Sequence, residues 1–284
     1  MRWPSYQHVF FDCDSTLTTI EGIDALAESA GKRWRIKVLT DAAMNGDLEL
    51  EEVYGKRLRA IKPTRGQVYA LRQQYKNNMV EDAAVVISTL QSLGHQVYII
   101  SGGLIEPVRE FGIYLGVPAE NIRAVGVAYN ELAGNWWIQP EEGQAQSEAR
   151  YINYRQDALT ISDGKAQIVR ELLGQQRGRS LLIGDGTSDL LAGQAVNLFV
   201  GFGGVVSRPR VQREAAVYIH SPSLAPLLPL AAGPAALRRV VQAEHKAAFN
   251  KALQLFSTGA ITFQDEQLSQ KFSKACKTVY TWSY

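Results

Sequence analysis

The chain has 284 residues, enough for one large domain or two modest ones, and its hydrophobic content of 46% can build a sizeable core. Its formal net charge of +2, from 30 Lys and Arg against 28 Asp and Glu, indicates no nucleic-acid or membrane partner. Two cysteines are too few for a disulfide framework, and residues 1–5 lack the apolar run of a signal peptide, so we expect a cytoplasmic protein.

The first predicted strand is the apolar run at residues 9–11, which ends at two carboxylates, Asp12 and Asp14. Ligands of open α/β sheets lie at the carboxyl ends of the strands, so both side chains are expected where chemistry occurs. Carboxylates so close repel each other, and they need a cation between them or a proton on one of them. The alternative is that Asp14 or Ser15 caps a following helix.

Four helical patterns follow before the next strand. Gly31 and Gly46 suit the ends of the first two helices, and Pro63 stops the third. Thr64 and Gln67 resemble a capping box that opens the fourth. We expect these helices over residues 21–30, 33–45, 49–61 and 64–77.

The chain then alternates between strands and helices, which predicts an α/β fold with a parallel, doubly wound sheet. We expect helices over residues 81–93, 104–115, 164–173 and 189–195. We expect strands over residues 96–100, 121–127, 180–183, 197–200 and 216–219, the last of which completes the sheet.

Two stretches carry weaker patterns. Residues 129–162 hold a turn signal beside Trp136 and Trp137, and they fit either an enlarged flap or a solvated loop with one aromatic anchor. Residues 235–284 predict two amphipathic helices, about 235–256 and 264–279, with seven Lys or Arg against three acids. Their aromatic end predicts docking either on the core or on a second subunit, and the second alternative gives a homodimer through this extension.

Ser101, Gly102 and Gly103 follow the predicted strand at 96–100 and precede a helix. A hydroxyl and two glycines at a helix N-terminus leave backbone N–H groups free to bind phosphate oxygens. The alternative is an ordinary turn between a strand and a helix.

These motifs together resemble those of the haloacid dehalogenase superfamily. Residues 12–16, Asp-Cys-Asp-Ser-Thr, resemble its first motif in the form found in the phosphoserine phosphatase-like family. Ser101 matches the second motif, Lys165 the third, and Gly-Asp-Gly-Thr-Ser-Asp at residues 184–189 the fourth. The resemblance covers roughly residues 8–230, with the stretch at 129–162 poorly matched.

The resemblance implies a Rossmann-like core with a small four-helix-bundle cap inserted after the first strand. The core would comprise residues 1–16 and 80–231, the cap residues 17–79, and a C-terminal helical extension residues 232–284.

The resemblance also implies roles for the motif residues. Asp12 would attack a phosphate ester and form an aspartyl phosphate, Asp14 would act as the acid and then the base, and Lys165 would neutralise the phosphoryl group. Asp12, the backbone carbonyl of Asp14 and Asp185 would hold Mg²⁺. Asp189 would orient metal-bound waters or Lys165. The acid Asp14 favours phosphoester hydrolysis, because an alkoxide leaving group needs a proton.

Glu21 and Arg57 match the family positions that bind the ammonium and carboxylate of phosphoserine, and Met44 matches a residue that closes over the ligand. Two positions depart from the family pattern: Ser188 replaces an Asn that helps to hold phosphate, and Leu50 replaces a Phe. The alternatives are that Glu21 only opens a helix and that Arg57 lies on a solvated face.

We therefore expect a phosphatase that hydrolyses phosphoserine, a small phosphorylated metabolite. A second hypothesis is a phosphatase or phosphotransferase for another small phosphomonoester, which the departures at Ser188 and Leu50 favour. A third, a binding module without activity, is weakened by the complete set of motif residues.

Overall fold

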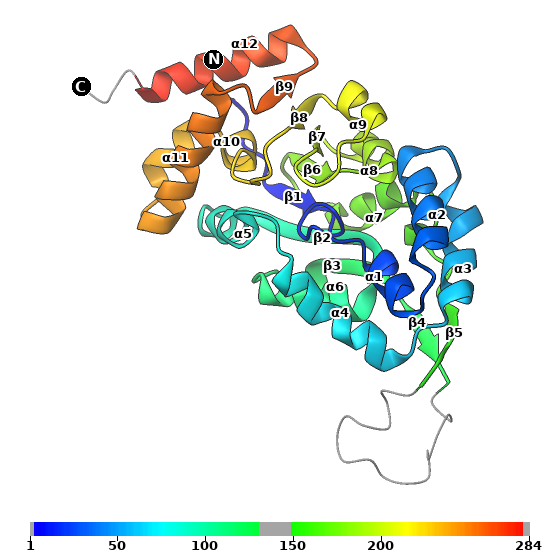
Figure 1. Ribbon diagram of the computed structural model, residues 1–284. Helices are drawn as coiled ribbons and strands as arrows, with labels where there is room; N and C mark the ends of the chain where they lie inside the picture. The colour runs from blue at the N-terminus through cyan, green and yellow to red at the C-terminus, as the bar shows by residue number, and fades with distance from the viewer. Residues whose placement is uncertain (1–2, 131–148, 281–284) are drawn as a thin grey trace.

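The computed structural model describes residues 3–130 and 149–280 (Figure 1). Their main sheet has seven strands in the order β3-β2-β1-β6-β7-β8-β9, of which the first six run parallel. The strands are β1 (His8–Phe11), β2 (Gln96–Leu104), β3 (Ile122–Val125), β6 (Ser180–Gly184), β7 (Leu198–Phe202), β8 (Val217–Ile219) and β9 (Ile261–Phe263). From β1 the chain adds β2 and β3 on one side and then β6, β7 and β8 on the other. Doubly wound sheets bind their ligands at such a point, beside the strand where the order switches sides.

Helices cover both faces of this sheet. Phe11 and Phe10 point to opposite faces and belong to two separate buried clusters. The flanking helices are α5 (Ala83–Ser92), α6 (Ile105–Tyr114), α7 (Gly164–Leu173), α8 (Thr187–Ala192), α9 (Pro209–Glu214), α10 (Leu227–Ala232), α11 (Ala243–Ser257) and α12 (Glu266–Tyr280). The fold class predicted from the sequence is confirmed.

The helices predicted between the first two strands are present within a residue of their expected ends. They are α1 (Gly22–Ser29), α2 (Arg33–Asn45), α3 (Leu50–Ile61) and α4 (Arg65–Asn77). The Gln67 N–H donates to Thr64 Oγ1 at 3.2 Å and the Thr64 N–H to Gln67 Oε1 at 2.9 Å, so the capping box forms. Figure 1 shows α1, α2 and α3 grouped at one end of the sheet, on the right of the view.

Helix α4 is tied to the core helix α6 by a row of ion pairs. Arg65 lies 3.2 Å from Glu106, and Arg72 and Lys76 each lie 3.1 Å from Glu110. Each pair is about one-third exposed or less, and such pairs become useful chiefly when they form a network. The last cap helix therefore lies fixed along the core.

The predicted strand at 121–127 is interrupted. Strand β3 ends at Val125, and a second, antiparallel ribbon begins at once with β4 (Val127–Tyr129), which pairs with β5 (Tyr151–Tyr154). Its second strand is bound to the cap, because the Tyr151 N–H donates to Pro63 O at 3.0 Å. The expected turn beside Trp136 and Trp137 lies outside the described residues.

The C-terminal part differs most from the sequence-based expectation. The helix predicted over 235–256 is wrong in its first part, which is a 3₁₀ turn at Pro234–Arg239, and α11 begins only at Ala243. Val240 breaks the pattern because it is extended and buries its side chain in the core. Strand β9 was not predicted, and it pairs antiparallel with β8, so the sheet neither ends at β8 nor is wholly parallel.

Residues beyond 232 also enter the main core. Phe272 of α12 is buried, and its ring centroid lies 4.8 Å from that of Trp3 and 4.4 Å from that of Phe256. The division into core, cap and extension stays a prediction. No helix among residues 3–130 and 149–280 is both long and apolar enough to cross a membrane.

Candidate active site

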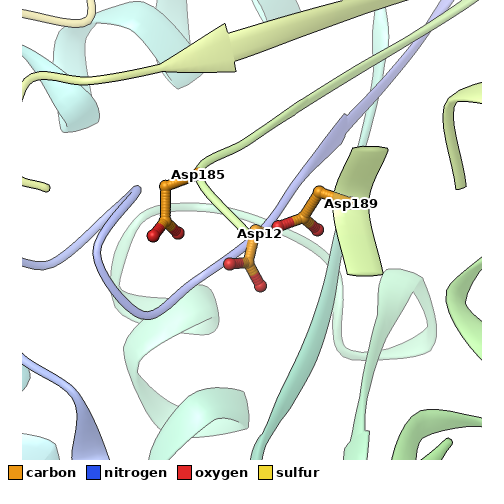
Figure 2. A group of neighbouring side chains, drawn as sticks. All are labelled: Asp12, Asp185 and Asp189. Carbon is orange, nitrogen blue, oxygen red and sulfur yellow. The ribbon is translucent and has the colours of Figure 1, made fainter. Parts of the chain in front are cut away.

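The site begins where two neighbouring strands end. Strands β1 and β6 pair in parallel with Phe11 opposite Ile183, and the Asp12 N–H donates to Ile183 O at 3.0 Å. Asp12 directly follows β1 and Asp185 directly follows β6, so the two side chains meet at one edge of the sheet. Asp189 joins them from α8, and the three carboxylates offer oxygens within 4.8 Å of one another (Figure 2).

Lys165 bridges two of these carboxylates from the first turn of α7. Its Nζ lies 2.7 Å from Asp12 Oδ1 and 2.6 Å from Asp189 Oδ1, and all three side chains are buried. The backbone allows this because residue 164 is glycine: a Cβ there would lie 1.6 Å from the carbonyl oxygen of Ala158. The lysine is thus held against the predicted nucleophile.

Burial sets the proton affinities of this cluster. Burial, followed by the charge of Asp189, raises the pKa of Asp12 to about 7 against the pull of Lys165. Burial opposes the charge on Lys165, but Asp12 and Asp189 outweigh it and raise the pKa of the ammonium. A cation beside Asp12 would favour its ionised form.

The donor chemistry fits a metal ion. Three buried carboxylates lie together, Lys165 pairs with two of them, and carboxylate oxygens are the ligands of hard divalent cations. Asp189 is already engaged through both oxygens, since Oδ1 accepts from Lys165 and Oδ2 accepts from the Gly186 N–H at 3.1 Å. Helix α8 begins at Thr187, two residues before its predicted start, because Asp189 caps it from within the first turn.

Sequence reasoning missed Arg208, which is buried beside Asp185. Its Nε donates to Asp185 Oδ2 at 2.9 Å, one NH group donates to Asn45 at 3.3 Å, and the other lies 3.8 Å from Glu21. The one local signal is the following Pro209, which favours the extended backbone that Arg208 adopts before α9.

Asp14 lies next to the cluster with one oxygen unpartnered. Its Oδ2 accepts from the Gly22 N–H at 3.2 Å, while Oδ1 is buried without a hydrogen-bond partner in the described part of the chain. Burial and the charge of Glu21 raise the pKa of Asp14 well above its usual range. Neither Asp14 nor Ser15 is the N-cap of α1, since that residue is Glu21.

A cavity of about 220 Å³ lies between helices α1 to α4 and the carboxyl ends of the central strands. Its lining includes every site residue that the sequence analysis singled out except Asp185 and Asp189: Asp12, Asp14, Glu21, Met44, Arg57, Ser101, Gly102, Gly103, Lys165 and Ser188.

The Ser-Gly-Gly stretch differs from its predicted setting. Strand β2 continues to Leu104, so Ser101, Gly102 and Gly103 lie within the strand and not at a helix N-terminus. The pairing register with β3 shifts between Ile100 and Leu104, which marks an irregularity at the two glycines. Ser101 Oγ accepts from the Gly103 N–H at 2.9 Å.

The cap supplies Glu21 and Arg57 to the same cavity. Glu21 Oε1 accepts from Ser15 Oγ at 2.8 Å. Arg57 is only 4% exposed, so the alternative of a solvated face is wrong.

Hydrogen bonds join the cap to the core around the cavity. The Tyr54 hydroxyl donates to Gly102 O at 2.8 Å, and the Thr187 hydroxyl donates to Met44 O at 2.9 Å. A third bond joins the Leu50 N–H to Ser162 Oγ at 2.9 Å. The cavity is thus closed by contacts from α2 and α3.

Several known proteins are similar to this chain. A family model for haloacid dehalogenase-like hydrolases matches residues 9–194. A phosphoserine phosphatase of Drosophila melanogaster is 35% identical over 218 residues, which are 75% of this chain and 74% of that protein. A phosphoserine phosphatase of Mus musculus is 32% identical over 215 residues, 74% of this chain and 88% of that protein.

Solved structures show the same fold. A phospho-aspartyl intermediate analogue of phosphoserine phosphatase aligns with a TM-score of 0.65 over 79% of this chain and 98% of that one, at 21% identity. A substrate-bound phosphoserine phosphatase complex aligns with a TM-score of 0.62 over 79% and 97%, also at 21% identity. With its family model, its relatives and this shared fold, the chain belongs to the haloacid dehalogenase-like hydrolases.

Proposed function

We propose that this chain hydrolyses O-phosphoserine to serine and phosphate through an aspartyl phosphate on Asp12. The observation that supports it most is one cavity lined by the Asp12–Lys165 pair, by the partly buried anion Glu21 and by the buried cation Arg57. The names of the fly and mouse relatives point to the same substrate.

In the proposed chemistry Asp12 acts as an ionised carboxylate and Asp14 begins as a protonated carboxyl. An Asp12 oxygen attacks phosphorus, the bond from phosphorus to the serine oxygen breaks, and Asp14 gives its proton to that oxygen. Asp14 then takes a proton from the water that hydrolyses the acyl phosphate. The raised pKa of Asp14 and its unpartnered Oδ1 suit the first of these steps.

Mg²⁺ is the metal that we propose, held by Asp12, Asp185 and the backbone carbonyl of Asp14. When bound, it supplies positive charge beside the phosphoryl oxygens. Asp189 holds Lys165 in place, and Lys165 neutralises Asp12 and the transferring group.

The substrate contacts follow from charge. We propose that Glu21 binds the ammonium and Arg57 the carboxylate of phosphoserine, since a guanidinium recognises a carboxylate through two hydrogen bonds. Ser101, Gly102, Gly103 and Ser188 would contact the phosphate, and the Gly103 N–H would exchange its present bond to Ser101 Oγ for one to a phosphate oxygen. Met44 would close over the ligand.

A different small phosphomonoester, or transfer to a second alcohol, is the alternative, and Ser188 and Leu50 favour it because they replace residues familiar in the family. The expected cytoplasmic location and the homodimer stay predictions. The apolar residues Phe272 and Ala275 of α12 are already buried within the chain.

Asp14→Asn should slow the hydrolysis of phosphoserine by about 100-fold or more, the usual worth of general acid catalysis. It should slow p-nitrophenyl phosphate far less, because p-nitrophenolate leaves without a proton. The measurement is kcat/KM for both esters, which covers the steps up to the aspartyl phosphate and leaves out its later hydrolysis, a step common to both. Equal losses on the two esters would rule out Asp14 as the general acid.

Chelation with EDTA should abolish turnover, and Mg²⁺ should restore it. Ca²⁺ should inhibit, because it accepts more ligands at longer distances and would let Asp12 bind through both oxygens. Phosphate release in EDTA, with each metal added back in turn, checks this. Full activity in EDTA, or equal activity with Ca²⁺, would contradict the metal's role.

Arg57→Ala should weaken phosphoserine hydrolysis by the cost of leaving a partly buried carboxylate unpaired, about 2–5 kcal/mol in kcat/KM. Glu21→Gln should also weaken it by removing the partner of the ammonium. Neither change should matter much for p-nitrophenyl phosphate, which has neither group.

Arg59→Ala provides the control, because Arg59 is exposed on the same helix. A wild type that hydrolyses phosphoserine no better than p-nitrophenyl phosphate, or a parallel loss of both substrates in Arg57→Ala, would refute the amino-acid substrate.

A further inference from the structure

Arg57 is a buried cation held by neutral groups. Its NH1 donates to Thr40 Oγ1 at 3.1 Å, and its guanidinium carbon lies 5.5 Å from the ring centroid of Tyr54. Among residues 3–130 and 149–280 it forms no ion pair, and its Nε has no hydrogen-bond partner. An isolated charge in such a place is costly, so the surrounding groups must fix and stabilise it.

Thr40 connects this cation to a carboxylate. Thr40 is fully buried in α2, and its Oγ1 lies 2.9 Å from Asp24 Oδ1 and 3.1 Å from Ile36 O. A hydroxyl has one proton to donate and two lone pairs to accept. The Arg57 N–H occupies a lone pair, so the proton is directed to an acceptor, and the charged carboxylate is the stronger one.

Asp24 stands one turn beyond Glu21 on α1, so the chain Asp24–Thr40–Arg57 joins α1, α2 and α3. Burial lowers the pKa of Arg57, and the charges of Glu21 and Asp24 act against that fall. A carboxylate in direct contact with Arg57 would occupy the forked face that a substrate carboxylate needs. The intervening hydroxyl leaves Nε unpartnered.

We infer that Thr40 is a positioning residue for substrate selection, whose hydroxyl links Asp24 to Arg57 and so orients the guanidinium toward a substrate carboxylate without pairing it. This inference rests on the proposed function, because it assigns a carboxylate ligand to Arg57. It adds two residues, Thr40 and Asp24, that would set the preference for carboxylate-bearing phosphate esters.

The test compares phosphoserine with phosphoethanolamine, which differs only by lacking the carboxylate. Thr40→Val keeps the shape and removes the hydroxyl, and it should lower kcat/KM for phosphoserine roughly tenfold or more, the scale of a hydrogen bond to a charged group. The same substitution should change kcat/KM for phosphoethanolamine by less than about twofold. Thr40→Ser keeps the hydroxyl and should retain most of the preference.

Thr89→Val is the matched control. Thr89 is also fully buried in a helix and bonds the carbonyl four residues earlier, at Val85, but it lies in α5. It should change neither the ratio of the two substrates nor the response to Arg57→Ala. In an Arg57→Ala background, Thr40→Val should have no further effect on phosphoserine, since the group that it positions is gone.

Three results would each overturn the inference. In Thr40→Val, kcat/KM could fall equally for both substrates, or the ratio of the two kcat/KM values could stay unchanged. In the double variant, the losses in kcat/KM for phosphoserine could be additive. A wild type that prefers phosphoglycerate to phosphoserine would refute the proposed substrate, while a selective loss on phosphoglycerate in Thr40→Val would still support the role of Thr40. If the wild type prefers no carboxylate-bearing ester, both proposals fall.

Discussion

The buried ion pairs of Lys165 with Asp12 and Asp189 are the interaction on which the site depends. They join the end of β1 to the starts of α7 and α8, and they place one ammonium between two carboxylates, with a third, Asp185, beside them. Breaking a buried pair leaves an uncompensated charge, so these elements must keep their relative positions. Gly164 is what lets α7 approach closely enough to bring the lysine there.

The cap extends this cluster into a selective cavity. The core supplies groups that act on a phosphoryl group, whereas α1, α2 and α3 supply an anion and a cation at fixed places. The bonds from Tyr54 to Gly102 and from Thr187 to Met44 close the cavity across the two parts. Helix α4 is bound separately to α6 by its own ion pairs.

Local patterns in the sequence predicted the cap helices and the central strands, since periodicity and capping residues act within one turn. The motif residues could be predicted as a group through their resemblance to the haloacid dehalogenase motifs, although Ser101 lies within β2 and not after it. Arg208 could not be, because its partner Asp185 lies 23 positions away, and the following Pro209 indicates an extended backbone but not the contact. Strand β9 spans only three residues and exists through its pairing with β8. The break at Val240 depends on burial.

The aspartyl phosphate on Asp12 is the central claim, and it can be detected directly. Enzyme quenched in acid during turnover of phosphoserine, then digested and examined by mass spectrometry, should carry one phosphoryl group on the peptide that contains Asp12. The Asp12→Asn variant should fold, as judged by circular dichroism, yet carry none and release no phosphate. An active wild type whose phosphoryl group is found elsewhere, or an Asp12→Asn variant that still turns over phosphoserine, would contradict the account.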